Sequence, residues 1–485
     1  MTFPPLPPLG DMSAEELRAH LHRMADWVAD YRAGIEGTPI VPTVAPGWVA
    51  AQNPVALPGA GAPMDAILDD LDRQVMPGVL HWGHPSFLGY FGSTSNGPAL
   101  LGEIAAAALN VSAMTWKTSP SATELEGVVL RWIRDMIGLD EPFMGIVYDT
   151  ASVGVLHALA AARERVAPGI RARGIVGRDD VPLLRVYASD QAHSSIAKAL
   201  VVLGLGEENL VRIGVVDAFE MDVGALRAQI LADRQRGFTP MAIVATVGTT
   251  STASVDPVAE IADVAEEYGA WLHVDAAYGG AMGVLPEGRA ALRGVERADS
   301  VVVNPHKWLF VPLDFSVLFV RDPEALRRVF ALTPEYLEGD AIEGATNYMD
   351  YGIQLGRRFR ALKAWMVFRA FGRDGIEARV REHCRLAEML TEWIAREEDF
   401  HLAAPQRMGV VCFRYRTPDM DDASVDRANE AIVERVNASG AAYLTHTRLQ
   451  GRVCMRVGLG NVLTEPRHVR GVWDLVVREA HAGIP

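Results

Sequence analysis

The feature that most constrains this chain is a regular alternation of apolar strands and helices through its middle. Stretches such as LLRVYASD, MAIVATVG and WLHVDAA are continuously apolar, and segments of helical periodicity separate them. Strands that are apolar on both faces are typical of a largely parallel sheet covered by helices on both sides. We therefore predict an α/β fold, with strands at 183–190, 209–216, 241–248, 271–277, 300–303 and 315–320, and helices at 194–204, 222–237 and 257–269.

The two ends of the chain follow other patterns. Near the start, an amphipathic helix with the capping box Ser13 and Glu16 is separated from the rest by a linker rich in Pro, Gly and Ala. A helix on such a linker can cover a partner subunit. Beyond about residue 370, a long amphipathic helix (376–394) leads to strands near 408–415 and 451–460. At 485 residues the chain suggests two or three domains. We expect a helical dimerisation segment (1–85), a large α/β domain (86–370) and a small α+β domain (371–485).

Composition excludes several classes of function. The net charge of −15 argues against a protein that binds nucleic-acid phosphates. The three cysteines are scattered and match no metal-binding spacing, which favours reduced thiols and a cytoplasmic protein without a metal. The N-terminus lacks the basic and apolar regions of a secretory signal, and no apolar run is long enough to predict a membrane span.

Polar residues gather where the predicted strands end, which is where parallel sheets bind ligands. Lys307 follows SVVV, Asp275 ends WLHVDAA, and His193 follows LLRVYASD. The segment 149–152, DTAS, precedes a helix whose N-terminus could hold a phosphate. Each signal alone has a structural explanation, namely an ion pair of Lys307 with Asp275, a hydrogen-bonding histidine at a helix start, or an ordinary helix cap.

Together, these groups suit a pyridoxal phosphate site. The amine can bind the cofactor aldehyde covalently, and the carboxylate can keep the pyridinium nitrogen protonated. The imidazole can stack on the ring, and the helix N-terminus can take the phosphate.

The motifs HPSFLGYF, SDQAHSSIAKA, WLHVDAAYGG and NPHKWL, in this order, make the chain resemble the pyridoxal-phosphate-dependent group II amino-acid decarboxylases. The aromatic-L-amino-acid decarboxylase branch is the most similar, and the resemblance covers nearly the whole length. It implies the type I aminotransferase-like fold. It also implies an obligate homodimer with shared active sites at the subunit interface, wrapped by the N-terminal helices.

The resemblance also implies roles for individual residues. Lys307 is the covalent lysine, Asp275 the pyridinium partner, and His193 the stacking residue that also contacts the substrate carboxylate. DTAS replaces the more usual Gly-Ser-Ala-Ser, so the roles of Asp149 and Thr150 stay open. The remaining expected cofactor contacts are Ala151, Ser152, Thr246, Ala277 and Asn304.

The reaction depends on a proton donor at the substrate Cα. By resemblance, Tyr336 in LTPEYLEGD is that donor, carried on a mobile loop; taken alone, it could be an exposed loop tyrosine. Relatives that make aldehydes often have Phe at this position, and others replace the stacking histidine with Asn. Because this chain keeps both Tyr336 and His193, amine formation is favoured over oxidative deamination.

The resemblance places Phe91, Ser93, Ser112, Met114 and Gly356 in the substrate pocket, with Ser112 and Met114 reaching it from the other subunit. Plain interface packing is an equal alternative for these residues. Glycine at 356 leaves room for an indole, so tryptophan, 5-hydroxytryptophan, dopa, tyrosine and phenylalanine remain open. The alternatives are an aromatic aldehyde synthase, a glutamate-type decarboxylase, for which the pocket motifs offer no obvious cation, and a catalytically inactive cofactor binder.

Overall fold

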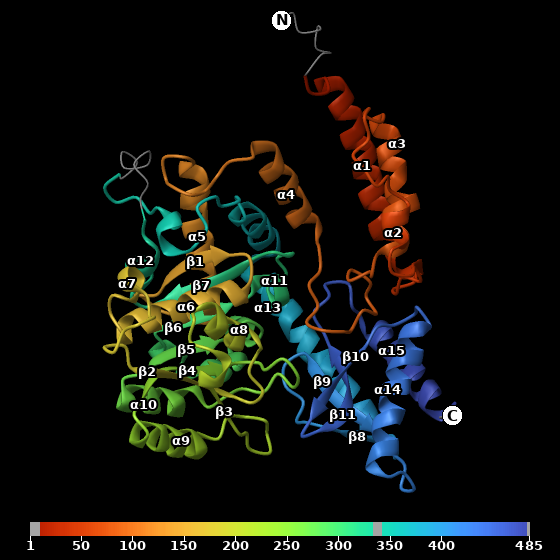
Figure 1. Cartoon of the computed structure of the whole chain (residues 1–485). Coiled ribbons are helices and arrows are strands. Elements are labelled where there is room, and N and C mark those ends of the chain that lie inside the picture. The colour runs from red at the N-terminus through yellow and green to blue at the C-terminus, as the bar shows by residue number, and fades with distance from the viewer. Residues whose placement is uncertain (1–9, 333–341, 483–485) are drawn as a thin grey trace, which may run out of the picture.

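The computed structural model describes residues 10–332 and 342–482, which form a helical arm, a large α/β part and a small α+β part (Figure 1). The helices are α1 (Ala14–Gly34), α2 (Trp48–Ala51), α3 (Met64–Asp70), α4 (Gly97–Leu109), α5 (Pro120–Ile137), α6 (Ala151–Val166), α7 (Ile170–Arg173), α8 (Ser195–Val202), α9 (Val223–Gln235), α10 (Val258–Tyr268), α11 (Pro305–Trp308), α12 (Pro323–Phe330), α13 (Ala361–Ile394), α14 (Asp422–Ala438) and α15 (Pro466–His481).

A seven-stranded sheet forms the centre of the large part, with the order β1-β7-β6-β5-β4-β2-β3. Strands β2 to β6 are parallel, whereas β7 runs antiparallel to both of its neighbours. The strands are β1 (Met144–Tyr148), β2 (Leu183–Ser189), β3 (Leu210–Ile213), β4 (Phe238–Thr246), β5 (Trp271–Asp275), β6 (Ser300–Val303) and β7 (Ser316–Val320). The expected α/β class is therefore confirmed.

The six predicted strands and three predicted helices of this region are present, but β1 was not predicted. It has only five residues, with Gly145 among them, so its sequence signal is weak. The reversed direction of β7 follows from its connection. The segment from β6 to β7 contains only the four-residue α11, which is too short to carry the chain back for a parallel crossover.

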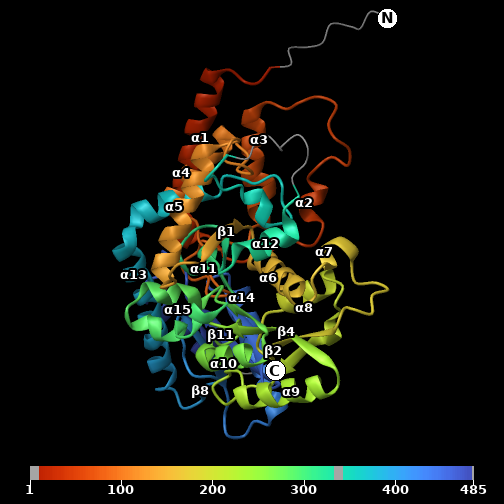
Figure 2. The same ribbon diagram turned by 90° about the vertical axis from the view of Figure 1, so that its left-hand side faces the viewer.

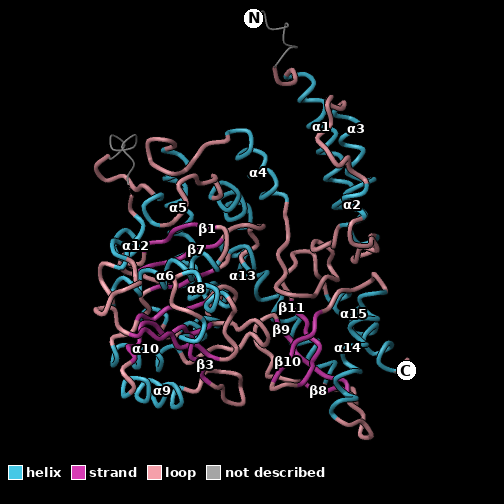
Figure 3. Tube along the Cα trace, in the orientation of Figure 1, coloured by secondary structure: helices cyan, strands magenta, loops and turns pink. Residues whose placement is uncertain are grey.

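The small part is built on a four-stranded antiparallel sheet, β10-β11-β9-β8. Its strands are β8 (Phe400–Leu402), β9 (Val410–Tyr415), β10 (Thr445–Leu449) and β11 (Arg452–Gly458), and α14 and α15 pack on the sheet. Helix α13 links the two parts and is interrupted at Gly372, which adopts a left-handed φ of 64°. The predicted helix 376–394 is the part of α13 beyond this break. Figure 3 shows the two sheets as separate groups of strands.

The arm consists of α1, α2 and α3, and it extends beyond both sheets in Figures 1 and 2. The predicted capping box of Ser13 and Glu16 is confirmed. Arg23 joins α1 to α3 through Asp65, at 2.8 Å, and through Asp69. No helix among the described residues has the length and apolar character that a membrane span requires.

Candidate active site

The sheet brings the predicted cofactor residues to one edge. Thr246 and Asp275, the last residues of β4 and β5, are partners in the parallel register. Asn304 follows β6 directly, and His193 lies in the turn after β2. Because parallel strands end at the same edge of a sheet, side chains that are far apart in sequence become neighbours there.

Asp275 is a buried carboxylate, with 6% of its surface exposed. Its Oδ1 accepts a hydrogen bond from the backbone N–H of Ala277 at 3.0 Å. The carbonyl of Ala277 in turn accepts from the N–H of Asn304 at 3.1 Å. Asp275, Ala277 and Asn304 are therefore tied together by one short backbone network, which fixes the direction of the carboxylate.

His193 has a defined hydrogen-bonding pattern. Its Nδ1 accepts from the backbone N–H of Ser195 at 3.2 Å and lies 2.9 Å from the Ser195 hydroxyl. The neutral ring therefore carries its proton on Nε2. Desolvation lowers the pKa of His193, the Asp275 carboxylate raises it, and the charge of Lys307 lowers it. His193, Asp275 and Lys307 are thus within electrostatic reach of one another.

Lys307 occupies the short helix α11, immediately after β6. Burial lowers the pKa of its amine, the Asp275 carboxylate raises it, and the charge of Arg456 lowers it. Its Nζ lies 4.9 Å from the ring centroid of Phe91. Among the described residues Nζ forms no ion pair, so the alternative of a direct salt bridge with Asp275 is not observed. A desolvated amine with a lowered pKa is a good nucleophile.

The expected anion site is the N-terminus of α6. The helix begins at Ala151, followed by Ser152, and Thr150 is its N-cap. The Asp149 carboxylate accepts the N–H of Thr150 at 2.7 Å, so the residue that departs from the usual motif organises this turn. The Asn304 Oδ1 accepts from the Ser316 hydroxyl at 2.6 Å, which leaves its amide NH₂ available as a donor.

Two buried polar atoms at this edge, Thr246 Oγ1 and Ser189 Oγ, and Nη2 of Arg456 from the small sheet find no hydrogen-bond partner among the described residues. Ser189 is the last residue of β2 and is fully buried. Buried polar groups are usually paired, and a polar ligand bound here would give these three atoms partners. Amine, carboxylate, helix N-terminus and orphaned donors together fit pyridoxal phosphate.

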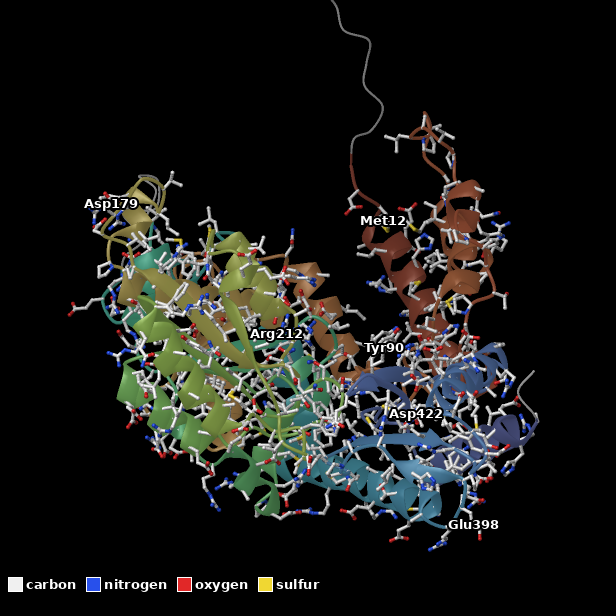
Figure 4. All side chains as sticks on the ribbon, turned by 60° about the horizontal axis from the view of Figure 1, so that its bottom comes forward. Met12, Tyr90, Asp179, Arg212, Glu398 and Asp422 are labelled. Atoms are coloured by element: carbon white, nitrogen blue, oxygen red, sulfur yellow. The ribbon has the colours of Figure 1, made fainter. Side chains whose placement is uncertain are left out.

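Sequence reasoning missed Arg456, which reaches the site from β11 of the small sheet. It is 4% exposed, and its Nε donates to the carbonyls of Thr250 and Ser251 at 3.1 and 3.0 Å. Its Nη1 donates to the Tyr90 carbonyl at 2.6 Å. Figure 4 shows Tyr90 where the arm, the large part and the small part meet. The signal available in the sequence was one arginine inside the apolar strand CMRVG.

The predicted pocket residues divide into two groups. Phe91 lies beside Lys307, stacks on Tyr278 at 3.9 Å between ring centroids, and has the Arg456 guanidinium 4.7 Å from its ring centroid. Ser93 follows it on the same segment.

Ser112, Met114 and Gly356 form the second group. The N–H of Ala113 donates to the carbonyl of Arg357 at 2.8 Å, which joins the two segments, and Gly356 is exposed. No contact among the described residues links this group to Lys307 within the chain. Tyr336 lies outside the described residues.

Three comparisons with known proteins complete this description. The family model of the pyridoxal-dependent decarboxylase conserved domain matches residues 46–416. The aromatic-L-amino-acid decarboxylase of Catharanthus roseus is 35% identical over 97% of this chain and 95% of its own length. The phenylacetaldehyde synthase of Arabidopsis thaliana is 36% identical over 97% of both chains. The crystal structure of Oryza sativa TDC with PLP and tryptamine superposes with a TM-score of 0.92, at 35% identity over 99% of both chains.

Proposed function

Since this chain belongs to the pyridoxal-dependent decarboxylase family, and is thus a pyridoxal-phosphate-dependent carboxy-lyase, we propose that it converts aromatic L-amino acids into arylalkylamines and CO₂. The observation that carries this proposal is the convergence of Lys307, Asp275 and His193 beside Phe91 and the orphaned Nη2 of Arg456. The relatives named for aromatic substrates, and the neighbour crystallised with tryptamine, support the same substrate class.

The cofactor, when bound, supplies a ring that withdraws the electrons left at Cα as CO₂ departs. Lys307 would hold it, and Asp275 would face its ring nitrogen. The N–H groups of Ala151 and Ser152 and the amide of Asn304 would hold its phosphate. Thr246 and His193 would then flank the ring, which gives the orphaned Thr246 hydroxyl a partner.

Two side chains, Arg456 and Phe91, would contact the substrate. The Nη2 of Arg456, buried and without a partner among the described residues, would hold the substrate carboxylate by a charge-assisted hydrogen bond. Phe91 provides an apolar wall for the substrate ring. Fixing the carboxylate at one end and the ring at the other would orient the Cα–carboxylate bond for cleavage. Tyr336 remains the proposed proton donor at Cα, on the basis of the family resemblance.

We also propose a homodimer in which residues 1–85 cover the partner, while 86–370 and 371–485 act as the large and small domains. Within the described residues, α1 has no buried position. Apolar side chains are exposed on α1, α3 and α4, namely Leu17, Leu21, Ile67, Leu101, Ile104 and Leu109. A second copy would bury these faces. It would also place Ser112, Met114 and Gly356 at the other active site. The cytoplasmic location stays a prediction.

A substrate panel with product identification tests the proposal. Purified protein with pyridoxal phosphate should release amine and CO₂ from tryptophan, 5-hydroxytryptophan, dopa, tyrosine or phenylalanine, and little from glutamate, because Arg456 would already be paired with the α-carboxylate. The aldehyde synthase is the second candidate, because the phenylacetaldehyde synthase matches this chain as well as the decarboxylase does. Aldehyde, ammonia and peroxide as the main products would establish that alternative. Turnover of glutamate alone would refute both.

A further inference from the structure

Strand β1 is the edge strand of the large sheet, with β7 as its neighbour. An edge strand leaves backbone N–H and C=O groups without a strand to pair with. At Val147 both groups are nevertheless satisfied by side chains. The N–H donates to Oε1 of Glu126 at 3.2 Å, and the C=O accepts from Nη2 of Arg357 at 3.0 Å. Glu126 and Arg357 thus supply the two hydrogen bonds that a residue of a neighbouring strand would otherwise make to Val147.

These two residues also form an ion pair with each other. Nη2 of Arg357 and Oε1 of Glu126 are 2.5 Å apart, and the residues are only 6% and 2% exposed. Such a buried pair gains little net stability over apolar packing, because desolvation offsets most of its attraction. It does define geometry, since Nη2 of Arg357 and Oε1 of Glu126 each also hold a backbone group of Val147. The pair holds backbone groups of two segments, at Val147 and at Ala113.

The first element it positions is the turn before α6, to which the proposed function assigns the phosphate. Val147 is followed by Tyr148, by Asp149, whose carboxylate organises the turn, and then by the start of α6 at Ala151. A shift of the end of β1 would therefore move the N–H groups of Ala151 and Ser152, which would hold the cofactor phosphate.

The second element is the segment that contains Ser112 and Met114. The Arg357 Nη1 donates to the Ala113 carbonyl at 3.0 Å, and the Ala113 N–H donates to the Arg357 carbonyl at 2.8 Å. Ala113 lies between Ser112 and Met114, and Gly356 directly precedes Arg357. The Arg357 side chain therefore contacts both the end of β1 and Ala113. The three residues proposed for the partner's pocket are direct neighbours of Ala113 or Arg357 in the chain.

We propose that Glu126 and Arg357 are a positioning pair that links the cofactor site of one subunit to the substrate pocket of the other. The pocket half of this inference rests on the proposed function, because it requires Ser112, Met114 and Gly356 to contact an aromatic substrate across the dimer. The cofactor half rests on the contacts of Val147 alone. A single substitution in the pair should therefore weaken pyridoxal phosphate binding and substrate binding together.

The test compares Arg357→Met, Arg357→Lys and Glu126→Gln with a matched control, Arg414→Met. Arg414 forms a 2.6 Å ion pair with Asp426, and Asp426 accepts a strand N–H from Val453 at 2.9 Å, so the control has the same type of contact in the small sheet. For each holoenzyme the measurements are the Kd for pyridoxal phosphate without substrate, KM and kcat for L-tryptophan, and the Tm.

We expect Arg357→Met to raise both the Kd and the KM about tenfold or more, with kcat falling less than KM rises, since misplacement acts through binding geometry. Arg357→Lys keeps the charge but lacks the planar guanidinium with its several donors, so its Kd and KM should rise less than those of Arg357→Met. Arg414→Met should lower Tm and leave Kd and KM within about twofold of wild type, because its contacts lie outside the site.

Three results would overturn the inference. Arg357 variants that lose only Tm, as the control does, would make the pair purely structural. A change in Kd without KM, or in KM without Kd, would remove the link between the two sites. If Arg357→Met does not fold, Glu126→Gln and Arg357→Lys decide by the same criteria. A wild-type protein that binds pyridoxal phosphate but turns over no aromatic amino acid would refute the proposed function. The Kd values of the variants would still test whether the pair positions the cofactor site.

Discussion

The substitution Arg456→Met tests whether the small sheet supplies the substrate-carboxylate contact. In the structure, three hydrogen bonds to the carbonyls of Tyr90, Thr250 and Ser251 fix the guanidinium. Its Nη2 is buried and has no partner among the described residues. Under the proposed function this nitrogen would hold the substrate carboxylate, which the amine product lacks.

The expected magnitude follows from the burial of Arg456. Removing one partner of a desolvated, hydrogen-bonded charge pair costs about 2 to 5 kcal/mol. At about 1.4 kcal/mol per factor of ten, kcat/KM for L-tryptophan should fall about 30- to 4,000-fold. Arg456→Lys keeps the charge without the planar fork, so its loss should be smaller.

Steady-state kinetics, together with inhibition by tryptamine, separate this effect from general damage to the site. Tryptamine has the ring and amine but no carboxylate, so its inhibition constant should stay within about threefold of the wild-type value. The content of pyridoxal phosphate, measured by absorbance, serves as the control for cofactor binding. An equal loss for tryptamine and tryptophan, or an unchanged kcat/KM, would refute the assignment of Arg456 to the carboxylate.

Three further predictions address other parts of the molecule. Lys307→Ala should reduce turnover more than about a thousandfold, because no other amine replaces the nucleophile, while circular dichroism shows an intact fold; sustained turnover would remove Lys307 from its role. Tyr336→Phe should raise the ratio of aldehyde to amine in product analysis, since the proposed proton donor at Cα is lost, and an unchanged ratio would speak against that donor. Burial lowers the pKa of His157 from 6.5 to about 3, and neither ring nitrogen has a partner among the described residues. Because the unfolded chain then binds the proton more tightly, the stability from neutral His157 is present above about pH 6.5 and is lost as the pH falls towards 3. His157→Leu should therefore recover about 2 kcal/mol of the stability lost between pH 7 and pH 5. Thermal unfolding at both pH values measures this, and an equal Tm drop in both proteins would contradict it.

Much of the site could be predicted from the sequence, because its parts lie next to strand ends. Asp275 and Thr246 are the last residues of strands whose apolar runs are easily recognised, and Lys307 and Asn304 follow a third. Once the sheet is known to be parallel, these residues must meet at one edge. The order of strands and helices thus predicted the fold class and the edge of the sheet at which these residues gather.

Contacts between distant segments could not be predicted in this way. The orphaned nitrogen of Arg456 comes from the small sheet, and no local pattern relates CMRVG to NPHKW. The same holds for the edge position of β1 and for the ion pair that covers it, since Glu126 and Arg357 belong to segments far apart in the chain.

Local sequence thus determined the strands, the helices and the residues at their ends, because hydrophobic periodicity and capping act over a few residues. Tertiary structure alone decided which side chains cover the edge of β1 and that Arg456 faces Phe91. Those depend on which surfaces meet when the whole chain packs, and the free energy of that packing is shared among residues that no short window of sequence contains.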